Sequence, residues 1–534
     1  MVRFLNYLFV LVFLFLIIFS CAKKGSPTGG PKDETAPLMV VTKPAHKSTF
    51  FKEEEIRIYF DEYIVLKDLN SQLIVSPPLK TPAVITPQGT ASKYIKIKIL
   101  DELRPNTTYT FNFGNAVRDN NEGNIIEDFK YIFSTGSYID SLKSTGSVIS
   151  SLDGKLKKNV SVLLYEYDST YTDSAFYQQK PKYVTKTVDS LHFEFTNIKE
   201  GKYLLLAIDE EASDYMFNPR KDKIAFFKDT IYLPKDSILN KNLELFKEEP
   251  VYKFKRGKET SRGKILFGYE GRPENMKVNL MSDVPNGFKA FSKFEKDADT
   301  LSYWFTPIEG LDSLNFTVFN KNAIVDTLTV RLRKKKLDSL QINATVSGTL
   351  NPRDTFFLKS NNPIVNIDKS KFSLISDSIP VNYDLKKQEV DKIALIFEKE
   401  FDKSYSFNGL PEGISDLYGC TNDSISYKFK TKTIEDYGSI ALEVKKEIPE
   451  PVIVELLSKD KVIRTSFVKE NSTITFEYLE PLTYKIRAII DDNKNNRWDT
   501  GNYLLKVQPE RIIYIDKELE LRPNWSLNET LTIE

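Results

Sequence analysis

The sequence predicts an all-β chain built of tandem β-sandwich domains. Three observations lead to this fold class. Apolar and polar residues alternate with period two in many short runs, most clearly in residues 94–99, 108–113 and 327–332. Turn-forming Asn, Asp, Gly and Pro separate such runs at intervals of roughly 8–15 residues. Beyond the first twenty residues, no apolar stripe repeats with the period of a helix.

Length and charge set the first limits on function. At roughly 100–150 residues per domain, the 534 residues correspond to about four or five domains. Lys and Arg number 75 against 74 Asp and Glu. Nothing in this balance supplies a basic surface for counterion release, so we expect no nucleic-acid partner. Only two Cys and two His are present, which leaves little for nucleophilic or metal chemistry.

The first twenty residues predict a signal peptide. Arg3 is followed by residues 4–19, which are apolar apart from Asn6 and too short to cross a bilayer easily. The end of this run, residues 18–21, resembles a lipobox, although Phe19 departs from the small residue that is usual there. The resemblance implies that residues 1–20 are removed and that Cys21 carries lipid. An uncleaved N-terminal anchor helix is the alternative.

Residues 21–37 predict a lipidated cysteine and a flexible tether, because Gly, Pro, Ser and Thr dominate and no apolar residue recurs. Several acyl chains on one cysteine make a stable membrane anchor. Ala22 provides no acidic retention signal, which favours the outer membrane. We expect the cell-surface face rather than the periplasmic face.

Residues 38–137 resemble a bacterial Ig-like domain of the SbsA type. The resemblance rests on a strand that follows a Leu-x-Pro-x-Thr-x-Tyr pattern, an Asp-Gly-Asn turn, and a closing Phe-x-Thr strand. The matching residues are Leu103, Pro105, Thr107 and Tyr109, then Val117, Asp119, Gly123 and Asn124, then Phe133 and Thr135. It implies an Ig-like sandwich with a spacer or binding role.

Residues 142–247 carry a second pattern. Phe193 to Ala207 read F-x-F-x-N-I-x-x-G-x-Y-x-L-x-A, which resembles the transthyretin-like or carboxypeptidase-regulatory-like sandwich. Gly201 is expected to form a tight turn between two strands whose alternation fixes their register.

Both units recur in the same order, which predicts a duplication. Residues 346–434 form a degenerate second Ig-like domain, with Phe429–Thr431 in the place of Phe133–Thr135. Residues 436–534 form a second transthyretin-like sandwich. In that alignment Val452–Leu456 take the place of Val160–Leu164, and Gly438 that of Gly146. Residues 251–345 lie between the copies and predict a β-sandwich of unknown type.

One loop follows the spacing of calcium ligands. Oxygen donors of Asp491, Asn493, Asn495 and Asp499, with the carbonyl group of Arg497, follow the 1, 3, 5, 7, 9 rhythm of a calcium loop. Asn496 replaces the usual turn glycine, and Asn502 replaces the twelfth-position Glu. The alternative is an Asx-rich loop packed under Trp498. Calcium is therefore a possible cofactor, and no other is expected.

The remaining candidate residues, a cysteine, a pair of carboxylates and three tryptophans, give little reason to expect catalysis or ligand binding. Cys420 is the only thiol left if Cys21 is lipidated, and both histidines lie in other predicted domains, so we expect an inert thiol. Asp61 and Glu62 are neighbours on a strand and point to opposite faces, which excludes a glycosidase pair. Trp304, Trp498 and Trp525 are expected to pack in cores.

The leading hypothesis is a non-enzymatic lipoprotein of a Bacteroidota-type outer membrane. It would be held by its lipid anchor and act as a structural or protein-interaction module, a subunit of an outer-membrane or envelope protein complex. A surface lipoprotein for adhesion or glycan binding through Trp-bearing loops is the second hypothesis. A hydrolase within residues 251–345 is the remote third.

Overall fold

The computed structural model describes residues 33–187, 192–239, 242–296, 298–307, 309–333 and 335–534. The predicted signal peptide, Cys21 and most of the tether lie outside this part. Nearly all of the regular secondary structure in the described ranges is strand, and the strands form pairs of facing sheets, so the prediction of tandem β-sandwiches is confirmed. No helix in the described ranges has the length and apolar character needed to cross a bilayer.

The first sandwich packs two sheets over a core that includes Ile58, Phe111 and Phe133. One sheet has the order β1-β2-β5-β4, with β7 paired to β2, and the other has the order β3-β6-β8. Its elements are β1 (Met39–Lys43), β2 (Glu55–Leu66), α2 (Leu69–Gln72), β3 (Ile74–Ser76), β4 (Val84–Thr86), β5 (Ser92–Lys98), β6 (Thr108–Gly114), β7 (Val117–Asp119) and β8 (Phe129–Ser134).

The second sandwich has sheets β11-β10-β13-β14, with β15 paired to β13, and β12-β9-β16. Strand β16 runs parallel to β9, while the other pairs are antiparallel. Its elements are β9 (Leu142–Ser150), β10 (Ser161–Glu166), α3 (Ala175–Gln178), β11 (Tyr183–Lys186), β12 (His192–Ile198), β13 (Gly201–Asp209), β14 (Lys223–Phe226), β15 (Ile231–Leu233) and β16 (Leu243–Leu245).

The third sandwich has sheets β17-β18-β21-β20 and β19-β22-β23. In β18, Ile265, Phe267 and Tyr269 are buried while the residues between them are partly exposed, so a register slip of one residue would turn the apolar face to water. Its strands are β17 (Lys253–Ser261), β18 (Lys264–Glu270), β19 (Lys277–Leu280), β20 (Ala290–Phe294), β21 (Thr300–Phe305), β22 (Ser313–Asn320) and β23 (Ala323–Arg331).

The fourth sandwich has sheets β24-β26-β31-β30 and β25-β34-β32-β28-β29, with the pair β27-β33 beside them. Its elements are β24 (Ile342–Ala344), β25 (Gly348–Thr349), β26 (Phe356–Ser360), β27 (Ile364–Ile367), η1 (Lys369–Lys371), β28 (Phe372–Ser376), β29 (Ile379–Pro380), β30 (Tyr383–Glu389), β31 (Lys392–Phe397), β32 (Ser404–Gly409), β33 (Ile414–Asp416) and β34 (Ile425–Lys430).

The fifth sandwich has sheets β37-β36-β39-β40, with β41 paired to β39, and β38-β35-β42. Strand β42 runs parallel to β35, as β16 does to β9 in the second sandwich. A short 3-10 helix, η2 (Ile434–Asp436), precedes it. Its strands are β35 (Gly438–Lys446), β36 (Val452–Ser458), β37 (Lys461–Val468), β38 (Ser472–Leu479), β39 (Thr483–Ile490), β40 (Ile512–Tyr514), β41 (Leu519–Glu520) and β42 (Ser526–Ile533).

The first and fourth sandwiches share a hydrogen-bond pattern at the corner before β6 and β32. The hydroxyl group of Tyr109 accepts the backbone N–H of Arg104 at 2.9 Å, and that of Tyr405 accepts the N–H of Glu400 at 3.0 Å. The closing threonines donate back to the same two residues, Thr135 to the carbonyl oxygen of Arg104 at 2.7 Å and Thr431 to that of Glu400 at 2.6 Å.

The second and fifth sandwiches match strand for strand. Val162 lies opposite Ala207, and Val454 lies opposite Ala488. Tyr203 donates its hydroxyl to the carbonyl oxygen of Lys199, four residues back, and Tyr484 does the same with Glu480, each at 2.8 Å.

One expected correspondence between these two units is wrong. Gly438 lies opposite Leu479, whereas Gly146 lies opposite Phe193, five residues before Ile198, which corresponds to Leu479. Gly438 therefore occupies the place of Leu142. Glycine marks a place where the backbone allows close approach rather than a fixed strand position, so two glycines alone could not set the register.

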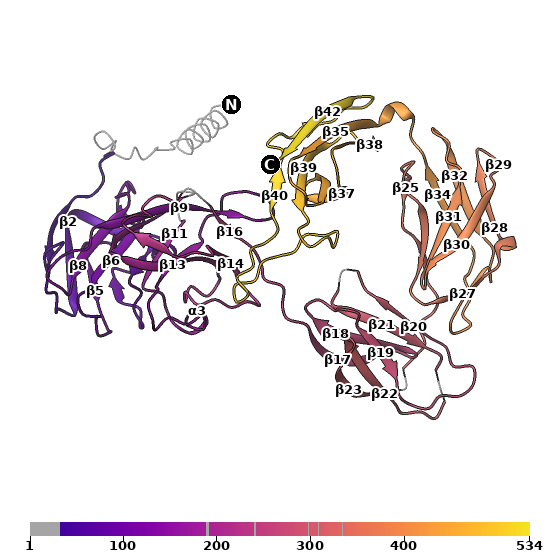
Figure 1. The fold of residues 1–534 in the computed structure, drawn as a ribbon, viewed down its shortest axis with the longest axis horizontal. Coiled ribbons are helices and arrows are strands. Elements are labelled where there is room, and N and C mark those ends of the chain that lie inside the picture. Colours follow the sequence, from indigo (N-terminus) through magenta and orange to yellow (C-terminus); the bar gives the residue numbers. More distant parts are fainter. Residues whose placement is uncertain (1–32, 188–191, 240–241, 297, 308, 334) are drawn as a thin grey trace, which may run out of the picture.

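The second to fifth sandwiches follow one another around a closed circuit, with the first sandwich attached to the second (Figure 1). Tyr418 of the fourth donates to the carbonyl oxygen of Gly263 in the third at 2.8 Å. Asn351 of the fourth donates to the carbonyl oxygen of Tyr478 in the fifth at 2.7 Å. The fifth returns to the second, where Arg487 donates to the carbonyl oxygen of Leu152 at 3.0 Å.

Candidate functional site

The loop between β39 and β40, residues 491–511, holds the predicted calcium ligands. Asp491 is 1% exposed and organises the first half of the loop. One of its carboxylate oxygens accepts the N–H of Asn495 and the other accepts the N–H of Asn496, both at 2.9 Å. Asn496 has a φ of 62°, the left-handed geometry that Asn tolerates better than most residues.

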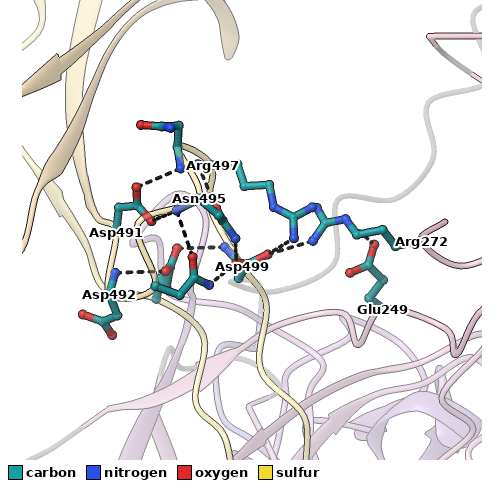
Figure 2. Close-up of polar contacts among 10 residues, drawn as sticks. Glu249, Arg272, Asp491, Asp492, Asn495, Arg497 and Asp499 are labelled. Atoms are coloured by element: carbon teal, nitrogen blue, oxygen red, sulfur yellow. Dashed lines mark hydrogen bonds and ion pairs between the residues drawn. The ribbon is translucent and has the colours of Figure 1, made fainter. Parts of the chain in front are cut away.

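The remaining predicted ligands are also satisfied within the loop and by the third sandwich. The side-chain oxygens of Asn493 and Asn495 accept the N–H groups of Asn495 and Arg497, each at 3.1 Å. Both Asn side chains donate to Asp499. Asp499 also forms ion pairs with the guanidinium groups of Arg272, at 3.0 Å, and Arg497, at 3.1 Å (Figure 2).

Glu510 closes the loop from its other end. Its carboxylate accepts the N–H of Asp492 at 3.1 Å and that of Asp499 at 2.9 Å. The indole N–H of Trp498 donates to the carbonyl oxygen of Glu510 at 3.0 Å. Burial raises the pKa of Glu510 above its ordinary value, and the nearby carboxylates of Asp499 and Asp491 add to this. The loop is therefore an ordered structure held by its own side chains.

These side chains fit an interdomain ion pair better than a calcium site. Calcium takes six to eight oxygen ligands, but Asp499, one of the predicted ligands, already accepts both Asn side chains and is neutralised by two guanidinium groups. Among the described residues, no group of three His, Cys, Asp or Glu side chains could hold a metal ion. The calcium assignment stays a prediction from spacing.

We expect the melting temperature of the chain to change by less than about 1 °C between 5 mM calcium and excess chelator, since only a ligand that binds the folded state raises it. Differential scanning calorimetry measures this directly. A rise of several degrees with calcium that disappears in Asp491→Ala would contradict this expectation and support the calcium loop.

The second half of the same loop docks into the second sandwich through Tyr503. This side chain is 0% exposed. Its ring centroid lies 5.2 Å from that of Phe176 and 5.4 Å from that of Phe226. Its hydroxyl group lies 2.7 Å from the hydroxyl of Tyr171 and donates to Asp173 at 3.0 Å. Tyr503 is thus part of the core of a domain that lies more than two hundred residues before it.

Polar contacts surround this aromatic anchor. The N–H of Tyr503 donates to the carboxylate of Glu248 at 2.6 Å, and the hydroxyl of Thr500 donates to the carbonyl oxygen of Lys247 at 2.6 Å. The Nζ atom of Lys506 lies 3.7 Å from the ring centroid of Tyr503 and forms an ion pair with the carboxylate of Asp173 at 2.7 Å. Burial raises the pKa of Glu248, and the N–H of Tyr503 only partly offsets this. We call the contact formed by residues 499–508 with the second sandwich the clasp.

The clasp leaves no room for a side chain at Gly501. A Cβ atom there would lie 2.6 Å from the Cζ atom of Phe246 and 2.7 Å from the carbonyl oxygen of Val507. Sequence reasoning assigned no role to Gly501 or Tyr503. A tyrosine two positions after a glycine in a polar loop was the only signal, and it does not reveal which surface the ring enters.

The second sandwich contains a counterpart of this loop between β13 and β14. Glu210 accepts the N–H groups of residues four and five positions later, Asp214 and Tyr215, as Asp491 does. Asp222 accepts the N–H of Asn218 at 2.7 Å, as Glu510 does with Asp499. Both loops contact the third sandwich at the end of β18, since Arg220 lies 3.5 Å from Glu270 and Asp499 pairs with Arg272. The corresponding loops of the second and fifth sandwiches therefore meet the same part of the third sandwich.

The other candidate residues lie apart from the clasp. Cys420 is partly buried and free, and burial together with Asp416 raises the pKa of its thiol. Trp304 is buried in the third sandwich as expected. The expectation that Trp525 packs in a core is wrong, since it is 48% exposed with Arg522 over its ring. Trp304 is buried in a different sandwich from the other two, so the three tryptophans do not form one surface for a sugar.

Comparison with known proteins identifies one part of the chain. Residues 33–135 match the family model of the bacterial Ig-like domain. No curated protein matches the chain.

Solved structures that match include the Bacillus anthracis TIE protein, at 10% identity and a TM-score of 0.13, covering 95% of this chain and 76% of that one. Domains 1–6 of the surface layer protein SbsC match at 9% identity and a TM-score of 0.14, covering 91% and 68%. The family match confirms the prediction of a bacterial Ig-like domain for the first sandwich.

Proposed function

We propose that the chain is a non-enzymatic, lipid-anchored protein of the outer membrane, where it acts as a scaffold subunit of an envelope protein complex. The observation that carries this proposal is the clasp. In a chain of independent domains joined by flexible linkers, the second and fifth domains need not contact each other. Here a fully buried tyrosine joins them, so that the loops and strand edges of four sandwiches are held in fixed relative positions.

Two further features support a scaffold. Ion pairs and hydrogen bonds occur at each junction around the circuit, for example Lys293 with Asp391 at 2.6 Å between the third and fourth sandwiches, and Arg353 with Glu477 at 2.8 Å between the fourth and fifth. A rigid arrangement reduces the entropy cost of engaging a partner through several domains at once. The lipobox-like residues 18–21 provide the anchor in this proposal.

A pull-down from membranes tests the proposal. The full chain would carry a tag at its C-terminus and be extracted from its native membrane in mild detergent. We expect a near-stoichiometric outer-membrane protein to co-purify, and we expect metabolic labelling with a palmitate analogue to mark the wild type but not Cys21→Ser. Cys420→Ser is the matched control and should keep the label. A wild-type chain that takes no label would contradict the lipid anchor. A wild-type chain that purifies alone would contradict the role as a complex subunit.

A further inference from the structure

The outward face of the sheet β1-β2-β5-β4 carries two rows of side chains that cross three strands. Val41, Tyr59 and Tyr94 lie opposite one another in the register and form the first row. The rings of Tyr59 and Tyr94 lie 5.5 Å apart. The neighbouring positions on the same face hold Lys43, Arg57 and Lys96, again directly opposite one another. An apolar and aromatic row thus lies beside a basic row.

The basic row works against the stability of the sheet. Like charges placed directly opposite across antiparallel strands destabilise the pair. Glu55 pairs with Arg57 at 2.7 Å, but in the part of the chain that the structure describes neither Lys43 nor Lys96 forms an ion pair. With a net charge of only +1, the chain has enough carboxylates to pair these three cations, and gathering them on one face does not help folding, which indicates an anionic partner for this face.

The edge of the same sheet exposes apolar residues. Strand β1 is an edge strand of its sheet. At this edge Leu38 and Val40 are 67% and 65% exposed, and the neighbouring Met39 and Val41 are exposed as well. Exposed apolar edge strands are a liability in water unless something covers them. Apolar residues, tyrosines and lysines together are the combination found at membrane–water interfaces, where rings and apolar side chains enter the headgroup layer and cations meet phosphates.

The tether brings this face to a membrane. Asn124 donates to the carbonyl oxygen of Asp33 at 2.9 Å, and Leu38 donates its N–H to Asp61 at 2.9 Å, so the chain is fixed to the first sandwich from residue 33 onwards. Asp33 lies twelve positions after Cys21, so twelve Cα–Cα steps join them. Their fully extended length is at most about 40 Å. With Cys21 in the membrane, even a weak surface contact is reinforced by a high effective concentration.

We propose that this face, with Val41, Lys43, Arg57, Tyr94 and Lys96, and the adjoining edge at Val40 lie on the anionic headgroup layer of the membrane that holds the lipid anchor. The proposal rests on the proposed function for the position of the membrane. Two carboxylates, Glu55 and Asp61, share this face, and Glu55 is paired with Arg57. The three cations of the basic row outnumber them, and Lys43 and Lys96 remain unpaired among the described residues. The first sandwich would then stand flat on the bilayer and set the direction in which the other four project.

Vesicle flotation with the full mature chain carrying Cys21→Ser, and therefore no lipid, tests this surface by itself. We expect binding to vesicles of phosphatidylethanolamine and phosphatidylglycerol that weakens with salt, and little binding to phosphatidylcholine vesicles. Lys43→Glu with Lys96→Glu should weaken binding at least about tenfold, because each lysine near an anionic surface contributes about 1 kcal/mol, a factor of about five. Val40→Asp should weaken it as well.

Lys277→Glu with Lys461→Glu, two exposed lysines of the third and fifth sandwiches, is the charge-matched control and should bind as the Cys21→Ser parent does. Absence of binding by the Cys21→Ser parent, equal binding to phosphatidylcholine, or equal losses in both double variants would each overturn the proposal. Such results leave the lipid label on Cys21 untouched, so they are distinguishable from a failure of the anchor itself.

Discussion

Tyr503→Ala should release the fifth sandwich from the second and open the circuit of domains. The substitution removes a ring packed against Phe176 and Phe226 and leaves Asp173 without the hydroxyl group that it accepts. Removing a buried aromatic side chain of this size costs about 3–5 kcal/mol. Small-angle X-ray scattering should show a larger radius of gyration, and hydrogen exchange should rise in residues 499–508 and in α3, while the strands of the first sandwich stay protected.

Two further variants make this result interpretable. Tyr503→Phe keeps the ring and removes only the hydroxyl group, so we expect a smaller loss, about 1–2 kcal/mol, with the circuit still closed. Tyr138→Ala removes an exposed tyrosine of similar size and should change neither the scattering curve nor the exchange. A closed, fully protected Tyr503→Ala chain would show that the remaining polar contacts hold the clasp without the ring.

Asp119→Ala should unfold the turn that closes the first sandwich. One oxygen of Asp119 accepts the N–H groups of Asn121, Glu122 and Gly123 at 2.6–3.0 Å, and the other accepts that of Asn124 at 2.6 Å. Loss of a buried carboxylate with four donors should cost about 3 kcal/mol. Hydrogen exchange of residues 117–126 measures the effect locally, and Glu127→Ala, an exposed residue beside the turn, is the control.

The same carboxylate predicts the direction of the pH dependence. Burial alone would raise the pKa of Asp119, but the four N–H groups outweigh it and lower the pKa below 3.8. Its contribution is therefore present above pH 3.8 and lost as the pH falls through the lower, folded value. Asp119→Asn keeps one acceptor oxygen and cannot ionise. The turn in this variant should therefore be less stable at pH 7 than in the wild type, and its stability should not change as the pH falls. An acid response unchanged from the wild type would assign it to other groups.

The two duplicated carboxylate turns show what a sequence can reveal. Asp119 and Asp416 occupy the same place in the first and fourth sandwiches, opposite Ile64 and Ile364. Both accept backbone N–H groups of the residues that follow, Asp416 from Tyr418 and Cys420. Such turns depend on residues only a few positions apart, so their geometry follows from local chemistry. The spacing of oxygen-donor residues in the loop at Asp491 is local in the same way. This spacing alone does not show whether a bound cation or internal hydrogen bonds hold the loop together.

The sequence by itself determined the β-sandwich fold, because period-two alternation and turn residues act over a few positions. It also predicted that the domains recur, because the motifs follow the same order in each proposed copy. Only the tertiary structure decided that Asp499 meets Arg272 and that Tyr503 enters the second sandwich. These contacts join residues hundreds of positions apart, and no local pattern encodes them. They arise only when five folded domains are placed against one another, and complementary surfaces, not strand propensity, select the partner.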